Sequence, residues 1–273
     1  MKRLCLLCLM VLAFVVRTEA ITVKDTVALL CVPQICNDVA YLLDSLKATL
    51  GIHNIRCVEI SIDNSGSKSL KQITKEMEKE IASQQKRHSA VGLISFDEAS
   101  FTALMAGARS PVDFLITVNG IFSDGADYYY DMQLLRHEGQ LAVRKELYQQ
   151  IEAIRAHKKP KGMLSVDLGR SYQKSVIAFE YADALKELKT PLFAIFSSNT
   201  GSWHNLMEYA TNLQIEMARN DNDAYRTWIV PDFLPRAGRV QLLEATMIYE
   251  FIRQHDNSFT PRLMGIFNDI LDD

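Results

Sequence analysis

Two adjacent carboxylates, Asp97 and Glu98, stand where a strand-like apolar run, residues 90–95, gives way to a helical pattern over residues 98–109. A carboxylate on such a turn can act as a nucleophile that forms an ester with its substrate. Release of that ester needs a water activated by a histidine, which an acid orients. The charge of Glu98 favours neutralising one carboxyl if both are buried, whereas the N-terminus of the helix favours the anion.

The elements that position these carboxylates alternate along the chain. Short apolar runs typical of strands cover residues 26–32, 55–62, 90–95, 112–119, 191–196 and 224–230. Helical spacing of apolar residues covers residues 38–50, 69–84, 98–109 and 240–253. Strands that alternate with helices favour a mostly parallel sheet with helices on both faces, so we predict an α/β fold.

The stretch from residue 125 to about residue 187 interrupts this alternation, because it is almost wholly helical in character. It begins with three tyrosines, Tyr128, Tyr129 and Tyr130. These side chains either line a ligand groove under a helical lid or pack the hinge of that lid, and the pattern leaves both open. We predict a single domain over residues 21–273, with a helical lid inserted at about residues 125–187.

The first twenty residues have the pattern of a secretory signal peptide. Lys2 and Arg3 precede an unbroken apolar run at residues 4–16, and Ala20 ends a short polar stretch. The run is too short to span a bilayer comfortably, and no later segment is apolar over a longer stretch. We therefore predict cleavage after Ala20, a secreted or periplasmic mature protein, and no transmembrane segment.

Composition excludes other classes of protein. With 48% hydrophobic and 23% charged residues, the chain is neither disordered nor a disulfide-stapled miniprotein. A formal net charge of −3 offers no basic surplus for a phosphate backbone, so we predict no nucleic-acid partner. The mature chain has three cysteines, Cys31, Cys36 and Cys57, with no metal-ligand spacing to histidine, and we expect small buried side chains rather than a structural disulfide. We predict no metal and no cofactor.

Three stretches carry a family resemblance. Residues 63–69 read DNSGSKS after a strand, residues 91–111 read VGLISFDEASFTALMAGARSP, and residues 32–34 read VPQ. They are similar to the acidic Gly-rich turn, the nucleophile elbow with its helix, and the oxyanion loop of the secreted esterase and peptidase-like branch of the α/β-hydrolase superfamily. The resemblance covers about residues 25–255. It implies an α/β-hydrolase-like fold and ester hydrolysis as the superfamily's activity.

The same resemblance places a catalytic triad on three positions that lack the usual residues. The elbow is the turn at residues 95–99, SFDEA, whose small outer residues suit a tight strand-to-helix turn. Its apex is Asp97, where the branch has serine. The acid belongs after the strand at 191–196, where Thr200 stands, and the base belongs after the last strand, where Pro235 stands. Because proline accepts no proton, we predict a pseudoenzyme.

The resemblance also suggests which residues would line the old cleft. Pro33 and Gln34 belong to the loop similar to the oxyanion loop, and Phe96 and Glu98 flank the apex. With Tyr128 and Tyr129 of the inserted segment, these are the candidate binding residues. Lys68 and Ser69 lack the upstream glycines of a phosphate-binding P-loop, so Ser69 is expected to cap a helix instead.

Two alternatives to a pseudoenzyme remain open. Some α/β-hydrolases, the haloalkane dehalogenase and epoxide hydrolase branches, use aspartate as nucleophile, but Pro235 in the base position leaves their ester intermediate blocked. Of six histidines, only His204 follows the acid loop, where it either approaches Asp97 as an unexpected base or begins a surface helix. The chain is therefore a pseudoenzyme that binds a small ligand or protein partner, an active carboxylic-ester hydrolase with a rearranged triad, or an interaction protein with a closed cleft.

Overall fold

The computed structural model describes residues 25–34, 40–136, 141–159, 170–197, 206–230 and 237–254. The predicted signal peptide lies outside the described residues, as do three positions singled out by the resemblance, Thr200, His204 and Pro235. Cys36 also lies outside them.

In the described part of the chain, six strands form one sheet in the order β2-β1-β3-β4-β5-β6, and every pairing between neighbours is parallel. The strands are β1 (Thr26–Pro33), β2 (Arg56–Ile62), β3 (Ala90–Phe96), β4 (Phe114–Val118), β5 (Leu192–Ser197) and β6 (Tyr225–Val230). The predicted parallel sheet is confirmed. Each apolar run of the sequence forms one strand, although β4 is shorter than its run at residues 112–119.

Helices connect the strands and cover both faces of the sheet. The helices of the alternating pattern are α2 (Ala40–Ile52), α3 (Leu70–Gln85), α4 (Ala99–Arg109), α10 (Leu206–Arg219) and α11 (Ala237–Gln254). Among the described residues, four more lie between β4 and β5: α5 (Gly125–Arg136), α6 (Leu141–Arg155), α8 (Ser171–Ile177) and α9 (Tyr181–Glu187). We call these four helices the insertion.

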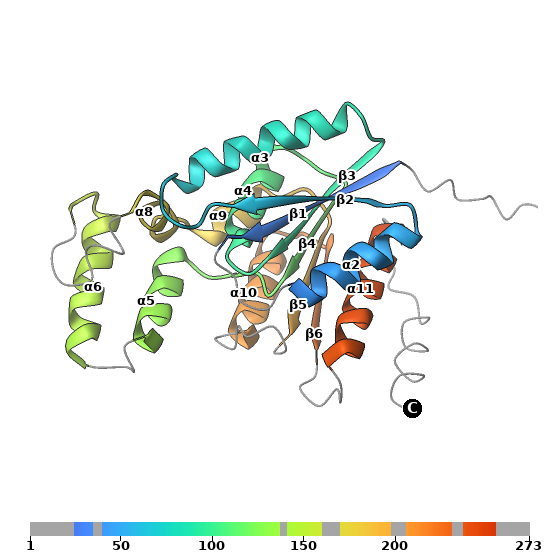
Figure 1. Ribbon diagram of the computed structural model, residues 1–273. Helices are drawn as coiled ribbons and strands as arrows, with labels where there is room; N and C mark the ends of the chain where they lie inside the picture. The colour runs from blue at the N-terminus through green and yellow to red at the C-terminus, as the bar shows by residue number, and fades with distance from the viewer. Residues whose placement is uncertain are drawn as a thin grey trace, which may run out of the picture.

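Side chains that alternate along each strand divide the core between the two faces. In β1, Val27 and Leu29 join a cluster with α3, α4, α10 and the insertion, whereas Ala28 and Leu30 join a second cluster with α2 and α11. Figure 1 shows α2 and α11 side by side, with α3 on the other side of the sheet. Both faces of the sheet are therefore buried.

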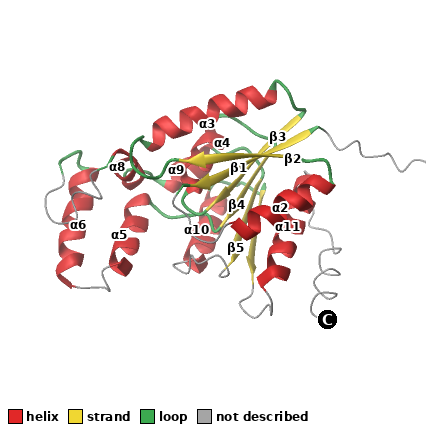
Figure 2. Cartoon of the chain, viewed as in Figure 1, coloured by secondary structure: helices red, strands yellow, loops and turns green. Residues whose placement is uncertain are grey.

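The order of the strands marks one edge of the sheet for function. The chain passes from β1 to β2 on one side and then crosses to β3 on the other side of β1. Ligands of open α/β sheets bind outside the carboxyl ends of the strands at such a switch point. Figure 2 shows the arrowheads of β1 and β2 pointing toward the insertion, so the insertion lies at this edge.

The two cysteines of the described residues are free thiols. Cys31 is fully buried in β1, and burial raises its pKa to about 12. Cys57 is partly buried in β2, and burial raises its pKa to about 11 although Lys47 opposes the shift. Both behave as apolar side chains, in keeping with the prediction. Within the described part of the chain, every helix is too short or too polar to cross a bilayer.

Candidate functional site

The turn between β3 and α4 has an unusual backbone at its apex. Asp97 has a φ of 45°, in the left-handed region that side chains other than glycine rarely enter. Its N–H donates to the carbonyl of Val118 at 3.0 Å, and its own carbonyl accepts from the N–H of Ser100 at 3.0 Å. The flanking Ser95 and Ala99 are fully buried, so there is no room for larger side chains. Asp97 is thus held at the carboxyl edge of β3 with its side chain partly exposed.

The neighbouring carboxylate, Glu98, joins three segments. Its Oε1 accepts a hydrogen bond from the hydroxyl of Tyr129 on α5 at 2.8 Å, and its Oε2 accepts one from the Nδ2 of Asn64 at 2.8 Å. Asn64 belongs to the loop between β2 and α3, and Glu98 is the N-cap of α4. The carboxylate therefore fixes the start of α4 against the insertion and the loop after β2.

Three tyrosines surround Glu98 and stay neutral. Burial, and then the negative charge of Glu98, hold the pKa of Tyr128, Tyr129 and Tyr172 well above the usual value. The rings of Tyr128 and Phe101 meet edge to face, with centroids 5.5 Å apart. Tyr172 on α8 is fully buried, and its hydroxyl has no hydrogen-bond partner among the described residues. The tyrosines at the start of the insertion therefore pack it onto α4, and Tyr129 also anchors Glu98.

The loop after β2 is ordered by its own polar side chains. The carboxylate of Asp63 accepts from the N–H of Ser65 at 3.0 Å and from the hydroxyls of Ser65 and Ser67. These hydrogen bonds, first from Ser65 and then from Ser67, lower the pKa of Asp63. Ser69 is the N-cap of α3, in a capping box with Gln72. The predicted cap is confirmed, and the role of this loop at the site is to present Asn64 to Glu98.

The candidate binding residues from the first loop and the elbow take different positions. Pro33 is buried, whereas Gln34 is exposed and its N–H donates to the carbonyl of Ile62 at 2.9 Å. Phe96 requires a correction. Phe96 is 1% exposed, in the core that the sheet forms with α2 and α11. Side chains alternate along β3, so Phe96 and Ser95 point to opposite faces of the sheet. Phe96 therefore offers a ligand no side-chain surface.

A second buried polar cluster, missed by the sequence analysis, lies at the ends of β4 and β5. Asn119 has a φ of 52°, and its side-chain amide donates from Nδ2 to the carbonyl of Ser197 at 2.8 Å while Oδ1 accepts from the N–H of Ser197 at 2.6 Å. Glu244 of α11 is fully buried nearby. Burial raises the pKa of Glu244 to about 7, and the hydroxyl of Ser197 partly opposes that shift. Residues four apart in a helix lie on the same face, and Glu244 is four residues before the buried Ile248. This spacing could have indicated that Glu244 lies on the apolar face of its helix.

The described residues contain no group of three or more His, Cys, Asp or Glu side chains that could hold a metal ion. The described site offers the Asp97 carboxylate, the hydrogen-bonded Glu98 carboxylate and neutral tyrosine hydroxyls. The sequence matches no protein-family model and no curated protein.

Solved structures do resemble it. Est1E from Butyrivibrio proteoclasticus superposes with a TM-score of 0.54 at 7% identity, covering 86% of this chain and 90% of that one. A structure described under the metagenome-derived lipolytic enzymes LipS and LipT gives 0.54 at 9% identity, with coverage of 85% and 96%. A lipase-esterase related protein from Clostridium acetobutylicum gives 0.50 at 15% identity, with coverage of 84% and 94%. The chain has the α/β-hydrolase fold. At these identities the α/β-hydrolase fold is shown and the chemistry is not.

Proposed function

We propose that this protein is a secreted α/β-hydrolase-fold pseudoenzyme that acts by binding a small ligand or a protein partner at the carboxyl edge of its sheet. The observation that supports this function is the apex of the β3–α4 turn, where the strained backbone position carries Asp97 instead of a serine. An aspartate there can form an ester but needs an activated water to release it. The expected base position carries Pro235, which supplies no proton acceptor.

The arrangement around the apex supports binding. Both oxygens of the Glu98 carboxylate accept hydrogen bonds from Asn64 and Tyr129, so this carboxylate is held in one place. A general base must reach the proton that it removes, whereas Glu98 already accepts hydrogen bonds from structural donors. The insertion is then a lid whose first helix is anchored beside Asp97.

The same geometry favours one second candidate, an ester hydrolase that uses Asp97 as nucleophile. A positive φ at a strand-to-helix turn is the backbone that presents a nucleophile in this fold. That candidate requires a base from elsewhere, and His204 is the sequence's candidate for it.

Hydrolysis of short-chain p-nitrophenyl esters by purified residues 21–273 separates the two. We expect no turnover above background from the wild-type chain, from Asp97→Asn or from His204→Ala. Turnover that disappears in Asp97→Asn and falls in His204→Ala would establish the hydrolase and exclude the pseudoenzyme. Turnover that neither substitution changes would place the activity at another site and would contradict both candidates.

A further inference from the structure

A pocket lies toward the end of α4 that is farther from the turn at Asp97. It is open to solvent, has a volume of about 540 Å³ and is lined by residues of α3, α4, α8 and α9. Pockets that bind small ligands have volumes of about 300–1,000 Å³. Arg109 at its mouth is the last residue of α4, which begins beside Asp97, so about 15 Å of helix separates the two places at 1.5 Å per residue.

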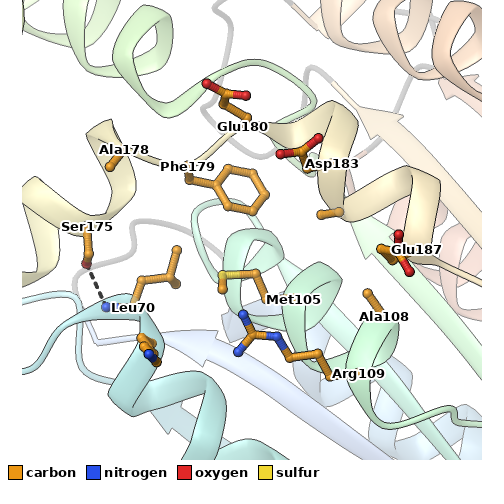
Figure 3. A pocket seen from close by; sticks show the side chains of 12 residues that line it. Leu70, Met105, Ala108, Arg109, Ser175, Ala178, Phe179, Glu180, Asp183 and Glu187 are labelled. Carbon is orange, nitrogen blue, oxygen red and sulfur yellow. Dashed lines mark hydrogen bonds between the residues drawn. The ribbon is translucent and has the colours of Figure 1, made fainter. Parts of the chain in front are cut away.

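The floor of this pocket is apolar and its walls are fixed. Leu70 of α3 and Phe179 between α8 and α9 are buried, and Met105 of α4 is partly buried between them. The N–H of Leu70 donates to the Oγ of Ser175 at 2.7 Å, which ties α3 to α8 across the pocket (Figure 3). The pocket is thus a feature of the packed domain, formed where the insertion meets α3 and α4.

Charge is divided between two walls. Glu180, Asp183 and Glu187 lie at the N-cap and along one side of α9, and all three are exposed. Their carboxylates form no hydrogen bond or ion pair with the other described residues. Figure 3 shows Glu180 and Asp183 on the side of the pocket opposite Arg109, with Phe179 and Met105 between them.

The opposite wall is basic. Lys71 of α3 is exposed, and Arg109 of α4 is half-exposed with its Nη1 3.8 Å from the Oε1 of Glu78. That separation is longer than a hydrogen bond. The Oε1 of Glu78 is buried, whereas half of the Arg109 side chain is exposed, so the guanidinium keeps N–H groups on its solvent side for a ligand. A ligand that fits both walls has a cationic end and an anionic end with an apolar body between them.

We propose that this pocket binds short peptides with free termini and apolar side chains. The terminal ammonium would lie against the carboxylates of α9, the terminal carboxylate against Lys71 and Arg109, and the side chains on Leu70, Met105 and Phe179. Three residues in extended form span at most about 11 Å, a length suited to a pocket between helices. This site goes beyond the proposed function, because it uses none of the residues at the carboxyl edge of the sheet.

Isothermal titration calorimetry of residues 21–273 with three matched probes tests the proposal. The probes are Leu-Leu-Leu, its N-acetylated form, which lacks the cation, and its C-terminal amide, which lacks the anion. We expect the free tripeptide to bind tightest, and each blocked form to bind about two- to fivefold more weakly, as exposed charge contacts do. Absence of saturable binding of the free tripeptide overturns the proposal.

Variants assign each charge to its wall. Asp183→Asn is expected to weaken the free and amide peptides but leave the acetylated one unchanged. Arg109→Gln is expected to weaken the free and acetylated peptides but leave the amide unchanged. Glu152→Gln, an exposed carboxylate on α6 away from the pocket, is the matched control and should change nothing. Asp183 and Glu152 are exposed, and glutamine at position 109 keeps N–H donors beside the buried Oε1 of Glu78, so the variants should fold.

A pocket-filling variant keeps the test independent of charge. Ala108→Trp places a ring in the pocket from α4 and should abolish binding of all three probes. Equal binding of the free and blocked forms would overturn the peptide assignment. Binding by the free and amide forms alone, insensitive to Arg109→Gln, would replace it with a site for simple amines.

Discussion

The hydroxyl of Tyr129 donates a hydrogen bond to the carboxylate of Glu98 at 2.8 Å, and this contact joins the first helix of the insertion to the turn that carries Asp97. The same carboxylate accepts from Asn64 at 2.8 Å, so one side chain holds two segments from either side of the turn. Tyr129 is 4% exposed, which shields the contact from water. The Glu98 carboxylate is therefore one of the contacts that hold the insertion beside the candidate site, together with the Leu70–Ser175 hydrogen bond and the packing of Tyr128 on Phe101.

Removal of the Tyr129 hydroxyl should destabilise the protein. Tyr129→Phe leaves the Glu98 Oε1 without its donor, and a hydrogen bond to a charged group contributes about 1.5–3 kcal/mol to the free energy of unfolding. Urea denaturation followed by circular dichroism measures the loss. Tyr148→Phe, an exposed tyrosine on α6, is the control and should leave the midpoint within error. An unchanged midpoint for Tyr129→Phe would show that this hydrogen bond contributes nothing to holding the insertion.

The backbone at Asp97 predicts an order of stability among substitutions. A β-branched side chain in the left-handed region costs about 1–3 kcal/mol, whereas asparagine and glycine tolerate this region. Asp97→Val should therefore unfold at lower urea than Asp97→Asn or Asp97→Gly.

Asp127, an exposed residue in the first turn of α5, provides the matched control. Helix propensity makes glycine less favourable than valine there, by a few tenths of a kcal/mol. We expect Asp127→Gly to be less stable than Asp127→Val, the reverse of the order at Asp97. The same order at both positions would argue against a left-handed residue at the apex.

The fold could be predicted from the sequence because its signals are local. Every strand is a short apolar run, and a helical pattern follows most of them, which specifies a parallel sheet covered on both faces. The sequence also indicated helices between residues 125 and 187, and the described residues of that stretch form α5, α6, α8 and α9. The cap at Ser69 was predicted for the same reason, since a capping box is read from four consecutive residues.

The candidate site could be predicted only in part, because its contacts join distant segments. Asn64 lies 34 residues before Glu98, and Tyr129 lies 31 residues after it. No local spacing pattern in the sequence predicts contacts between residues so far apart. The direction of Phe96 could have been found by alternation from Ser95, since neighbours in a strand face opposite sides. The cluster of Asn119 and Ser197 spans 78 residues and depends on β4 and β5 being neighbours in the sheet.

Glu244 should make stability fall as pH rises. Burial raises its pKa from 4.5 to about 7, so the folded protein holds a proton that the unfolded chain releases between these two values. More protons bound in the folded state mean that the free energy of unfolding decreases with pH across that window. At 1.36 kcal/mol per pH unit the decrease amounts to about 3 kcal/mol for this residue.

Glu244→Gln isolates this contribution, because the amide does not titrate. Urea denaturation of both proteins at pH 4.5, 6 and 7.5 should show stability of the wild-type chain falling relative to the variant as pH rises. Burial also raises the pKa of Asp124, which gives a slope of the same sign in both proteins and cancels in the comparison. A wild-type curve parallel to that of Glu244→Gln would show that this carboxyl is ionised in the folded protein.

The contact between α5 and α8 predicts a severe effect of one added methyl group. A Cβ at Gly125 would lie 1.7 Å from the carbonyl oxygen of Val176, which is backbone and cannot rotate away. Gly125→Ala should therefore force α5 and α8 apart and destabilise the protein, as overpacking does, by about 1–3 kcal/mol. Gly51→Ala is the matched control, because no atom lies within 4 Å of a Cβ at this position in α2, and removing a helical glycine there should stabilise by about 0.5–1 kcal/mol. Thermal and urea denaturation measure both variants, and a Gly125→Ala protein as stable as the wild type would contradict the close approach of these two helices of the insertion.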